Sequence, residues 1–504
     1  MAQGILRFKY EEEKHDTGMT GLSGLPVYLE LMKAMGLPKL MGSRLQVKQR
    51  GWTDTQMVSS LILLNLAGGD CVEDLERVQK DEGFCKLLRR VEQQGMRRSE
   101  RREVDRRWRK ERWRSVPAPS SVFRYLSAFH DGSQEETRKG GKAFIPVPNE
   151  HLRGLAKVNQ GMASFIQKRN PEKTATLDQD ATLVETAKRD ALYSYQGFKS
   201  YQPLNTWWAE QQVVLHTEFR DGNVPAGYEQ LRVLKESLAL LPEGVEQVRL
   251  RSDTAGYQHS LLRYCEHGED ARFGRIEFAI GVDLTPEFKK AVLAEVSQTD
   301  WQPIYREFDG NRIQTNQEWA EVCFIPNAIA RRLDSPVYRY LAIREPLGSM
   351  DLPGMPQQEF PFQTVQVDLQ RYKLFGLVTN MDWDGARLIH WHRERCGKSE
   401  EAHSVMKGDF SGGKLPSGDF GENAAWWWIM ILAMNLNTIM KRLVLGGSWV
   451  NRRMKAIRFS LIAIPGRIVE RSRTLIIRLA KGHPAFDLYI EARRRIMAMT
   501  PVYG

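Results

Sequence analysis

The sequence changes its pattern at Thr174, and this change limits the folds that the chain can adopt. From there on, short stretches typical of strands first follow one another directly and then alternate with helical stretches. This arrangement predicts an α/β fold with a mixed sheet and helices on its faces. Strands are expected at 174–183, 211–219, 246–252, 273–282, 338–344 and 372–379, and helices at 228–241 and 286–296.

Helices are expected on both sides of this region. Apolar residues recur at helical spacing near the N-terminus, where one helix is predicted from Asp54 to Ala67. A polar, Gly-containing linker at 131–142 follows these helices, and after Asp382 the sequence is typical of helices to its end. Residues 300–372, rich in Pro and Gly, contain short β-like pieces and are typical of an insertion.

The positive charge is concentrated in two segments. The 504 residues carry a formal net charge of +11. Residues 89–115 hold 12 Lys and Arg against 5 Asp and Glu, and residues 451–504 hold 12 against 3, which leaves the rest at −5. Such segments favour a polyanion as partner. A solvated helix face is the alternative for the first segment, although Trp108 and Trp113 favour nucleic acid; a membrane surface fits less well.

Composition excludes several other classes of protein. Apolar residues make up 42% and charged residues 27%, which is typical of a globular chain with a sizeable core. Five scattered cysteines without a C-x-x-C pair argue against a disulfide framework and against structural zinc. The longest apolar run, Ala424–Met434, is shorter than the roughly 20 residues that span a bilayer, and the N-terminus has no signal-peptide core. We therefore expect a soluble, intracellular protein in which this run forms a buried helix.

Four carboxylates are candidates for metal-dependent chemistry. Asp178 and Asp180 lie two residues apart on a predicted strand, so both project from one face of the sheet. Asp253 follows another predicted strand, and Glu400 lies near the start of a predicted helix with Lys407 two turns further on. Carboxylates from two strands and a helix can hold the two Mg²⁺ ions of a phosphoryl-transfer site.

Each of these signals has an alternative interpretation. A D-x-D sequence on a strand also occurs in nucleotide-sugar transferases, and an Asp at the end of a strand is often only a turn former or a cap. Glu400 or its neighbour Glu401 would be an ordinary solvated residue if the helix faced water there.

Three blocks of the sequence together carry a resemblance. They are TLDQDATLVETAKRDALYSYQGFKSYQPL, RLRSDTAGY and RCGKSEEAHSVMKGDFSGGKLPSGDFGENAAWWWIMILAMNL. These blocks are similar to the catalytic blocks of bacterial insertion-sequence transposases. They resemble the DDE superfamily with an RNase H-like core, specifically the thirteen-eighty group related to piggyBac elements. The resemblance extends in order over roughly residues 20 to 500.

The resemblance implies roles for individual residues. Asp253 is the second catalytic Asp and Glu400 the catalytic Glu, while the first Asp is either Asp180 or Asp178. All would bind two Mg²⁺ (or Mn²⁺) ions. Related transposases carry an Arg four residues before the Glu, but Cys396 stands there in this chain, with Arg395 beside it.

The resemblance also implies a β-rich insertion, with which residues 300–372 agree. In related enzymes such insertions help to handle a flipped base or a DNA hairpin. Trp301 and Trp319 are candidate stacking residues, with core packing as the alternative.

These inferences together predict a DNA transposase that binds terminal inverted repeats and catalyses cleavage and strand transfer. The expected partners are double-stranded DNA and a second copy of the chain in a homodimer or higher oligomer, with no membrane, in the cytoplasm at the nucleoid. A non-catalytic DNA-binding protein derived from a transposase is the rival, and a nucleotide-sugar transferase is a further alternative. Residues expected to contact DNA are Arg97, Arg98, Arg101, Arg102, Arg106, Arg107, Lys199, Arg395 and Lys407.

Five regions are expected along the chain. They are a helical, Arg-rich DNA-binding region (1–140), the first part of an RNase H-like catalytic domain (141–299), the β-rich insertion (300–372), the last core strand with the Glu-bearing helices (373–450) and a basic helical C-terminal segment (451–504).

Overall fold

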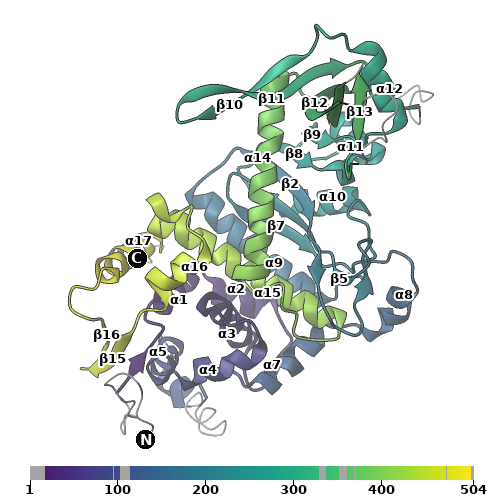
Figure 1. Cartoon of the computed structure of the whole chain (residues 1–504). Helices are drawn as coiled ribbons and strands as arrows, with labels where there is room; N and C mark the ends of the chain where they lie inside the picture. The colour runs from purple at the N-terminus through teal and green to yellow at the C-terminus, as the bar shows by residue number, and fades with distance from the viewer. Residues whose placement is uncertain are drawn as a thin grey trace, which may run out of the picture.

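The computed structural model describes residues 17–94, 96–102, 114–327, 336–350, 360–367, 370–472 and 474–500, without the side chains of 349–350 and 396–400. Helices from both ends of the chain pack together below a large sheet, and the strands of the insertion lie at the opposite end of the molecule (Figure 1). The long helix α14 (Gly385–Ser404) runs between these two parts.

The N-terminal region is helical, as the sequence predicts. Helix α3 (Asp54–Ala67) has the expected bounds, because Thr53 and Gln56 form a capping box at its start and Gly68, with φ of 98°, ends it. The other helices here are α1 (Leu25–Ala34), α2 (Leu37–Arg44), α4 (Leu75–Lys80), α5 (Glu82–Glu92), α7 (Pro119–Leu126), α8 (Glu135–Lys139) and α9 (Glu150–Arg169).

Five strands form one half of the sheet in the spatial order β7-β6-β2-β8-β9, with β7 at the edge. Strands β2, β6 and β7 are antiparallel neighbours, whereas β8 and β9 run parallel to β2. The expected mixed sheet is therefore confirmed, although the short β6 (LNTWW) was not predicted. The bounds are β2 (Thr174–Ala181), β6 (Leu204–Trp208), β7 (Val213–Glu218), β8 (Gln247–Ser252) and β9 (Glu277–Gly281).

The segment predicted as an insertion extends this sheet. Strand β14 (Gln370–Thr379) pairs with β9, and further antiparallel neighbours continue the sheet from β14 to ten strands in all, counted over the described residues. The added strands are β10 (Gln302–Phe308), β11 (Asn311–Val322), β12 (Arg339–Met350) and β13 (Thr364–Val367). A separate small sheet contains β3 (Val184–Glu185), β4 (Leu192–Tyr193) and β5 (Lys199–Tyr201).

Helices cover both faces of the half of the sheet that contains β2 and β8. Helix α10 (Gln230–Leu240) lies on the face of Gln179, since Ser237 Oγ is 2.9 Å from Thr206 Oγ1, which in turn contacts the Gln179 amide. Helix α14 lies on the opposite face, where Asp178 and Asp180 project. Helices α11 (His259–His267) and α12 (Pro286–Glu295) connect the later strands.

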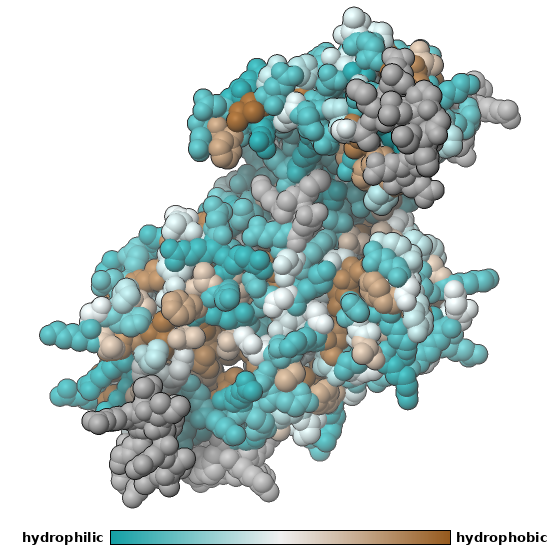
Figure 2. Space-filling model, in the orientation of Figure 1, coloured by the Kyte–Doolittle hydropathy of each residue, from teal (hydrophilic) through white to brown (hydrophobic). Residues whose placement is uncertain are grey.

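Helix α15 (Phe420–Ile439) contains the apolar run and is buried along its whole length. With the turn that follows, to Leu445, it is the candidate membrane span among the described helices, but 83% of the apolar window is buried inside the protein. It packs against α3, α9 and β7, and Trp427 Nε1 donates to Thr217 Oγ1 at 2.9 Å. The face of the molecule in Figure 2 is mostly hydrophilic, as expected when the apolar helix lies inside.

The C-terminal segment is not helical throughout, contrary to the expectation. Strands β15 (Gly466–Arg471) and β16 (Thr474–Arg478) form a hairpin before the last helix α17 (Ala485–Met499). Their β-branched residues, such as Ile468 and Ile476, favour strands. Strand β15 also pairs with β1 (Met19–Thr20), which joins the two ends of the described chain in one small sheet.

The packing between the chain ends gives a testable prediction. A methyl group on Gly24 would meet the backbone of Leu461 and Ile462. Gly24→Ala is therefore expected to lower the free energy of unfolding by about 1–3 kcal/mol, measured by urea titration. Gly132→Ala is the control, because no atom lies near its added methyl group; equal stability of both variants would contradict the packing.

Candidate active site

Two aspartates lie at the carboxyl ends of neighbouring parallel strands. Gln179 of β2 is opposite Ser252 of β8, so Asp180 and Asp253 are the next residues along these two strands. Asp253 Oδ1 accepts a hydrogen bond from the Ala255 amide at 3.0 Å and caps a short 3-10 helix there. This register brings Asp180 and Asp253 to one edge of the sheet.

The electrostatics of Asp180 agree with this closeness. Burial raises the pKa of its carboxyl group to about 6; the Arg395 guanidinium opposes the rise, and the Asp253 carboxylate adds to it. Arg395 Nη1 lies 3.2 Å from Asp180 Oδ2, and the Asp180 side chain is 20% exposed. Two hard oxygen ligands that repel each other in a partly buried site fit a divalent cation, because the cation relieves that repulsion.

Asp178 has a different environment from Asp180, although both lie on the same face of β2. Arg251 binds it with both ends of its guanidinium, at 2.6 Å and 2.9 Å. The Arg251 and Asp178 side chains are only 1% and 2% exposed. Burial raises the pKa of Asp178, and Arg251 opposes that rise. Both carboxylate oxygens of Asp178 are thus occupied by Arg251.

Helix α14 is fixed to the same strands by contacts along one face. Arg251 Nη1 donates to the Trp391 carbonyl at 2.5 Å and lies 3.4 Å from Glu394 Oε2. His392 Nε2 is 3.0 Å from the Ser252 carbonyl, and burial lowers the pKa of this imidazole to about 3, so it is neutral at pH 7. With the Arg395–Asp180 ion pair, these contacts hold α14 across the sheet beside the aspartates.

The helix carries the predicted glutamate beyond these contacts. Residue 400 lies in α14 five residues after Arg395, about 7.5 Å along the axis. The Glu400 side chain lies outside the described residues, so its meeting with Asp180 and Asp253 stays a prediction. Lys407, in the π-helical turn that follows, donates to the Leu183 carbonyl at 3.3 Å, three residues beyond Asp180.

The predicted DNA contacts lie in several parts of the chain. Arg97, Arg98, Arg101 and Arg102 are exposed, whereas Arg106 and Arg107 lie outside the described residues, as do Trp108 and Trp113. Lys199 Nζ donates to the Arg189 carbonyl at 2.6 Å. Within the described residues, Arg395 is the predicted DNA contact that directly touches a candidate metal ligand.

The two tryptophans of the insertion take part in packing. Trp319 is buried against Gly385, and the Arg344 guanidinium covers the ring of Trp301 at 4.1 Å. These contacts favour the alternative interpretation, in which both residues pack rather than stack on a base.

Sequence reasoning missed three residues near the aspartates. Arg251 and His392 fix α14, and Asp283 follows β9, the next parallel strand after β8. Burial and the nearby Asp253 charge raise the pKa of Asp283. An arginine within a predicted strand, two residues before Asp253, was a signal that could have identified Arg251.

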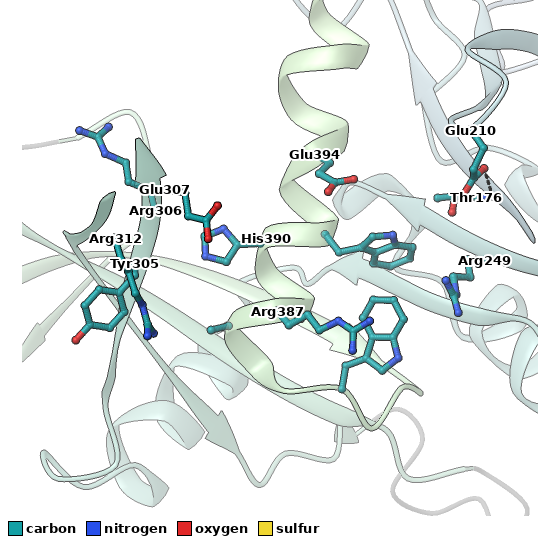
Figure 3. Close-up of a pocket in the computed structure, with 13 residues that line it drawn as sticks. Thr176, Glu210, Arg249, Tyr305, Arg306, Glu307, Arg312, Arg387, His390 and Glu394 are labelled. Carbon is teal, nitrogen blue, oxygen red and sulfur yellow. Dashed lines mark hydrogen bonds between the residues drawn. The ribbon is translucent and has the colours of Figure 1, made fainter. Parts of the chain in front are cut away.

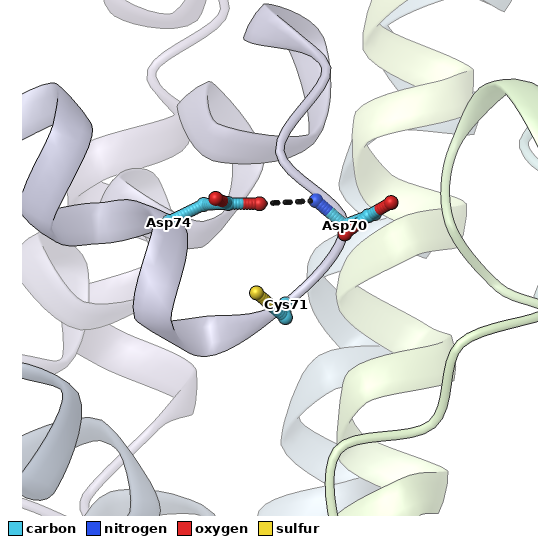
Figure 4. Close-up of side chains that lie close together, drawn as sticks. All are labelled: Asp70, Cys71 and Asp74. Atoms are coloured by element: carbon cyan, nitrogen blue, oxygen red, sulfur yellow. Dashed lines mark hydrogen bonds between the residues drawn. The ribbon is translucent and has the colours of Figure 1, made fainter.

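A second group of possible metal ligands lies in the N-terminal helical region (Figure 4). Asp70, Cys71 and Asp74 have ligand atoms within 4.8 Å of one another. Asp70 pairs with Lys414, while Asp74 accepts from the Asp70 amide at 3.1 Å and pairs with Arg77 at 3.3 Å. Because these carboxylates already have cationic or amide partners, the group is explained as local structure.

Comparison with known proteins identifies the family. The family described as Transposase DDE domain group 1 matches residues 14–323 and 359–501. The chain belongs to this family. It is therefore a member of the DNA transposases with a DDE domain, as the three sequence blocks indicated.

A solved structure is also similar to this transposase. It is the cryo-EM structure of a piggyBac transposase synaptic complex with hairpin DNA, at 11% sequence identity and a TM-score of 0.40. The similarity covers 95% of this chain and 80% of that chain. No curated protein matches the chain.

The raised pKa of Asp180 predicts a pH-dependent difference in stability from its amide variant. Between an unfolded pKa of about 4 and the folded value of about 6, the folded protein keeps a proton that the unfolded chain releases. The wild type therefore loses stability relative to Asp180→Asn as pH rises through this window, by up to about 3 kcal/mol. Urea titrations from pH 4 to pH 7 with EDTA measure this difference, and a difference independent of pH would contradict it.

Proposed function

We propose that this transposase binds the terminal inverted repeats of an insertion sequence and catalyses metal-dependent cleavage and strand transfer. The observation that carries the proposal is the placement of Asp180 and Asp253 at adjacent strand ends, with α14 fixed beside them. Asp180, Asp253 and Glu400 would hold the divalent ions, two Mg²⁺ or Mn²⁺, by carboxylate oxygens. The ions supply activation of the attacking oxygen and stabilisation of the leaving oxygen.

The protein's own residues would position these ligands and the DNA. Asp253 keeps one oxygen on the Ala255 amide, so the other oxygen is the one that would bind an ion. Arg395, beside Asp180, offers a guanidinium suited to a phosphate near the scissile bond. Lys407 adds a second cation within reach of the loop after β2. The first catalytic aspartate is proposed to be Asp180, because Arg251 occupies both oxygens of Asp178.

DNA recognition is proposed to lie largely outside the sheet. The exposed arginines at 97, 98, 101 and 102 would contact backbone phosphates of the inverted repeat, which binds protein in a salt-dependent way. Synapsis of two transposon ends would require at least two copies of the chain. These steps would take place at the nucleoid in the cytoplasm.

Cleavage of DNA ends tests the proposal against its non-catalytic rival. The DNA that flanks the gene supplies the end sequence, and the wild type is compared with Asp253→Asn in Mg²⁺. Cleavage by the wild type alone supports the proposal. Equal cleavage by both proteins rejects the site, and cleavage by neither, with binding intact, favours a DNA-binding protein derived from a transposase.

A further inference from the structure

A pocket of about 670 Å³ lies between the β10–β11 hairpin, the first half of α14 and the strands β2 and β8. In Figure 3 the hairpin supplies Arg306 and Arg312 from one side, α14 supplies Arg387 and His390, and the sheet supplies Arg249 from the other side. Four arginines from three separate parts of the chain therefore line one cavity, although Arg306 points outward from the hairpin, and the family's carboxylates do not explain this cavity.

Aromatic rings hold three of these four guanidinium groups in place. Arg387 and Arg249 lie over Trp383, at 4.3 Å and 4.8 Å from its ring centroid, and Arg312 lies over Tyr305 at 4.1 Å. An arginine stacked on a ring keeps its N–H groups available at the edge, with little further entropy to lose on binding an anion. The pocket is thus built from pre-ordered donors.

The charge balance leaves these donors available. Arg249 is paired with Glu277 at 2.7 Å, so it has a structural partner. Among the described residues, no carboxylate pairs with Arg312 or Arg387. Of the glutamates that line the pocket, Glu210 accepts from the Thr176 amide at 2.8 Å and Glu394 lies 3.4 Å from Arg251. The third, Glu307, is opposite Arg312 in the β10–β11 register and offsets part of the positive charge. Arg387 and Arg312 nevertheless keep their N–H groups out of any ion pair among the described residues.

The pocket lies in line with the aspartates on one face of the sheet. Thr176, Asp178 and Asp180 alternate along β2 on that face, and Thr176 lines the pocket. Four residues of strand separate Thr176 from Asp180 by about 13 Å. This distance corresponds to roughly four nucleotide steps measured along the helix axis of B-form DNA.

We propose that this pocket binds backbone phosphates of the DNA strand whose scissile bond lies at Asp180 and Asp253. The proposal rests on the proposed function of that site and adds to it a second anchor for the same strand. Arg312 and Arg387 are its phosphate contacts, and the β10–β11 hairpin forms the side of the pocket that would contact the DNA strand opposite the sheet. Because the contacts are to phosphate, they are independent of base sequence.

Salt-dependent DNA binding tests the proposal. Binding of a fluorescein-labelled duplex of arbitrary sequence is measured by anisotropy at several salt concentrations with EDTA present, which prevents cleavage. Arg312→Ala and Arg387→Ala are each expected to reduce the slope of log K against log salt by about 0.9, as each loses one phosphate contact. Arg387→Glu is expected to weaken binding more than Arg387→Ala.

Lys235→Ala is the matched control. Lys235 is also an exposed cation held over a ring, 4.5 Å from Tyr264, but it lies on α10, on the opposite face of the sheet. The slope of log K against log salt for Lys235→Ala is expected to equal that of the wild type. Circular dichroism melts show whether each variant is folded.

The outcomes separate this proposal from the proposed function. Unchanged slopes for both arginine variants overturn the pocket, even when Asp253→Asn still fails to cleave DNA. An equal loss of slope in Lys235→Ala also overturns it, since the effect would then be one of net charge. Reduced slopes together with normal cleavage by Asp253→Asn keep the pocket as a DNA contact and reject the catalytic site.

Discussion

Asp180→Asn is expected to lower the rate of DNA-end cleavage by about 1000-fold, and Asp253→Asn by a similar factor. Each amide keeps the shape of the side chain but removes the negative charge that would hold a divalent ion between the two strand ends. The loss of several kcal/mol of charge stabilisation in the transition state corresponds to this factor. Single-turnover cleavage of end DNA in Mg²⁺, resolved on a denaturing gel, measures it.

Asp283→Asn is the matched control for both variants. Asp283 follows β9, the next parallel strand, and the nearby Asp253 charge contributes to raising the pKa of Asp283. The residue is nevertheless exposed. The Asp283→Asn variant is expected to cleave DNA at a rate within about 10-fold of the wild-type rate. This factor corresponds to a change in activation free energy of about 1.4 kcal/mol or less. DNA affinity in EDTA should be unchanged in Asp180→Asn. Full cleavage by Asp180→Asn would exclude this carboxylate from the site.

Asp178→Asn is expected to destabilise the folded protein by about 3–5 kcal/mol. The change removes one partner of a buried ion pair and leaves the Arg251 charge without its counter-ion, which is the costly way to disrupt such a pair. Because Arg251 also holds the Trp391 carbonyl, the cost includes a looser contact of α14 with the sheet. Urea titration followed by circular dichroism measures the loss.

A double substitution separates charge from packing at this position. Asp178→Leu with Arg251→Met removes both charges together and is expected to recover much of the lost stability, because no unpaired charge then remains. A stable Asp178→Asn protein without cleavage activity would contradict our assignment and place Asp178 among the metal ligands.

The sequence predicts the part of the site that depends on local pattern. A strand that ends in an aspartate singles out Asp180 and Asp253 as candidates. That their strands are parallel neighbours is a finding of the structure, because other strands as well as a helix lie between them in the sequence. The choice between Asp178 and Asp180 as the first catalytic aspartate could not be predicted, since both side chains project from the same face of the strand. It depends on Arg251, 73 residues away in sequence, and on the depth at which each carboxylate lies.

Long-range pairing explains the other differences. Residues 300–372 look like an independent insertion because their strands are short and interrupted by Pro and Gly, yet β12 pairs with the expected core strand β14 and makes the sheet continuous. The β15–β16 hairpin lies in a basic segment surrounded by helices, and β15 is completed by two residues near the N-terminus. Such partners are set by tertiary packing, which a local pattern does not contain.

The pairing of β1 with β15 has a consequence for how the protein is made. Met19 and Thr20 leave the ribosome long before Gly466 and Arg467, their partners in the small sheet, have been translated. Arg458, which donates to the carbonyls of Asn65 and Leu66 in the N-terminal helices, is also translated late. A premature stop codon before residue 458 therefore removes contacts from the N-terminal region as well as from the C-terminal segment, so damage near the end of the gene also weakens the region that is translated first.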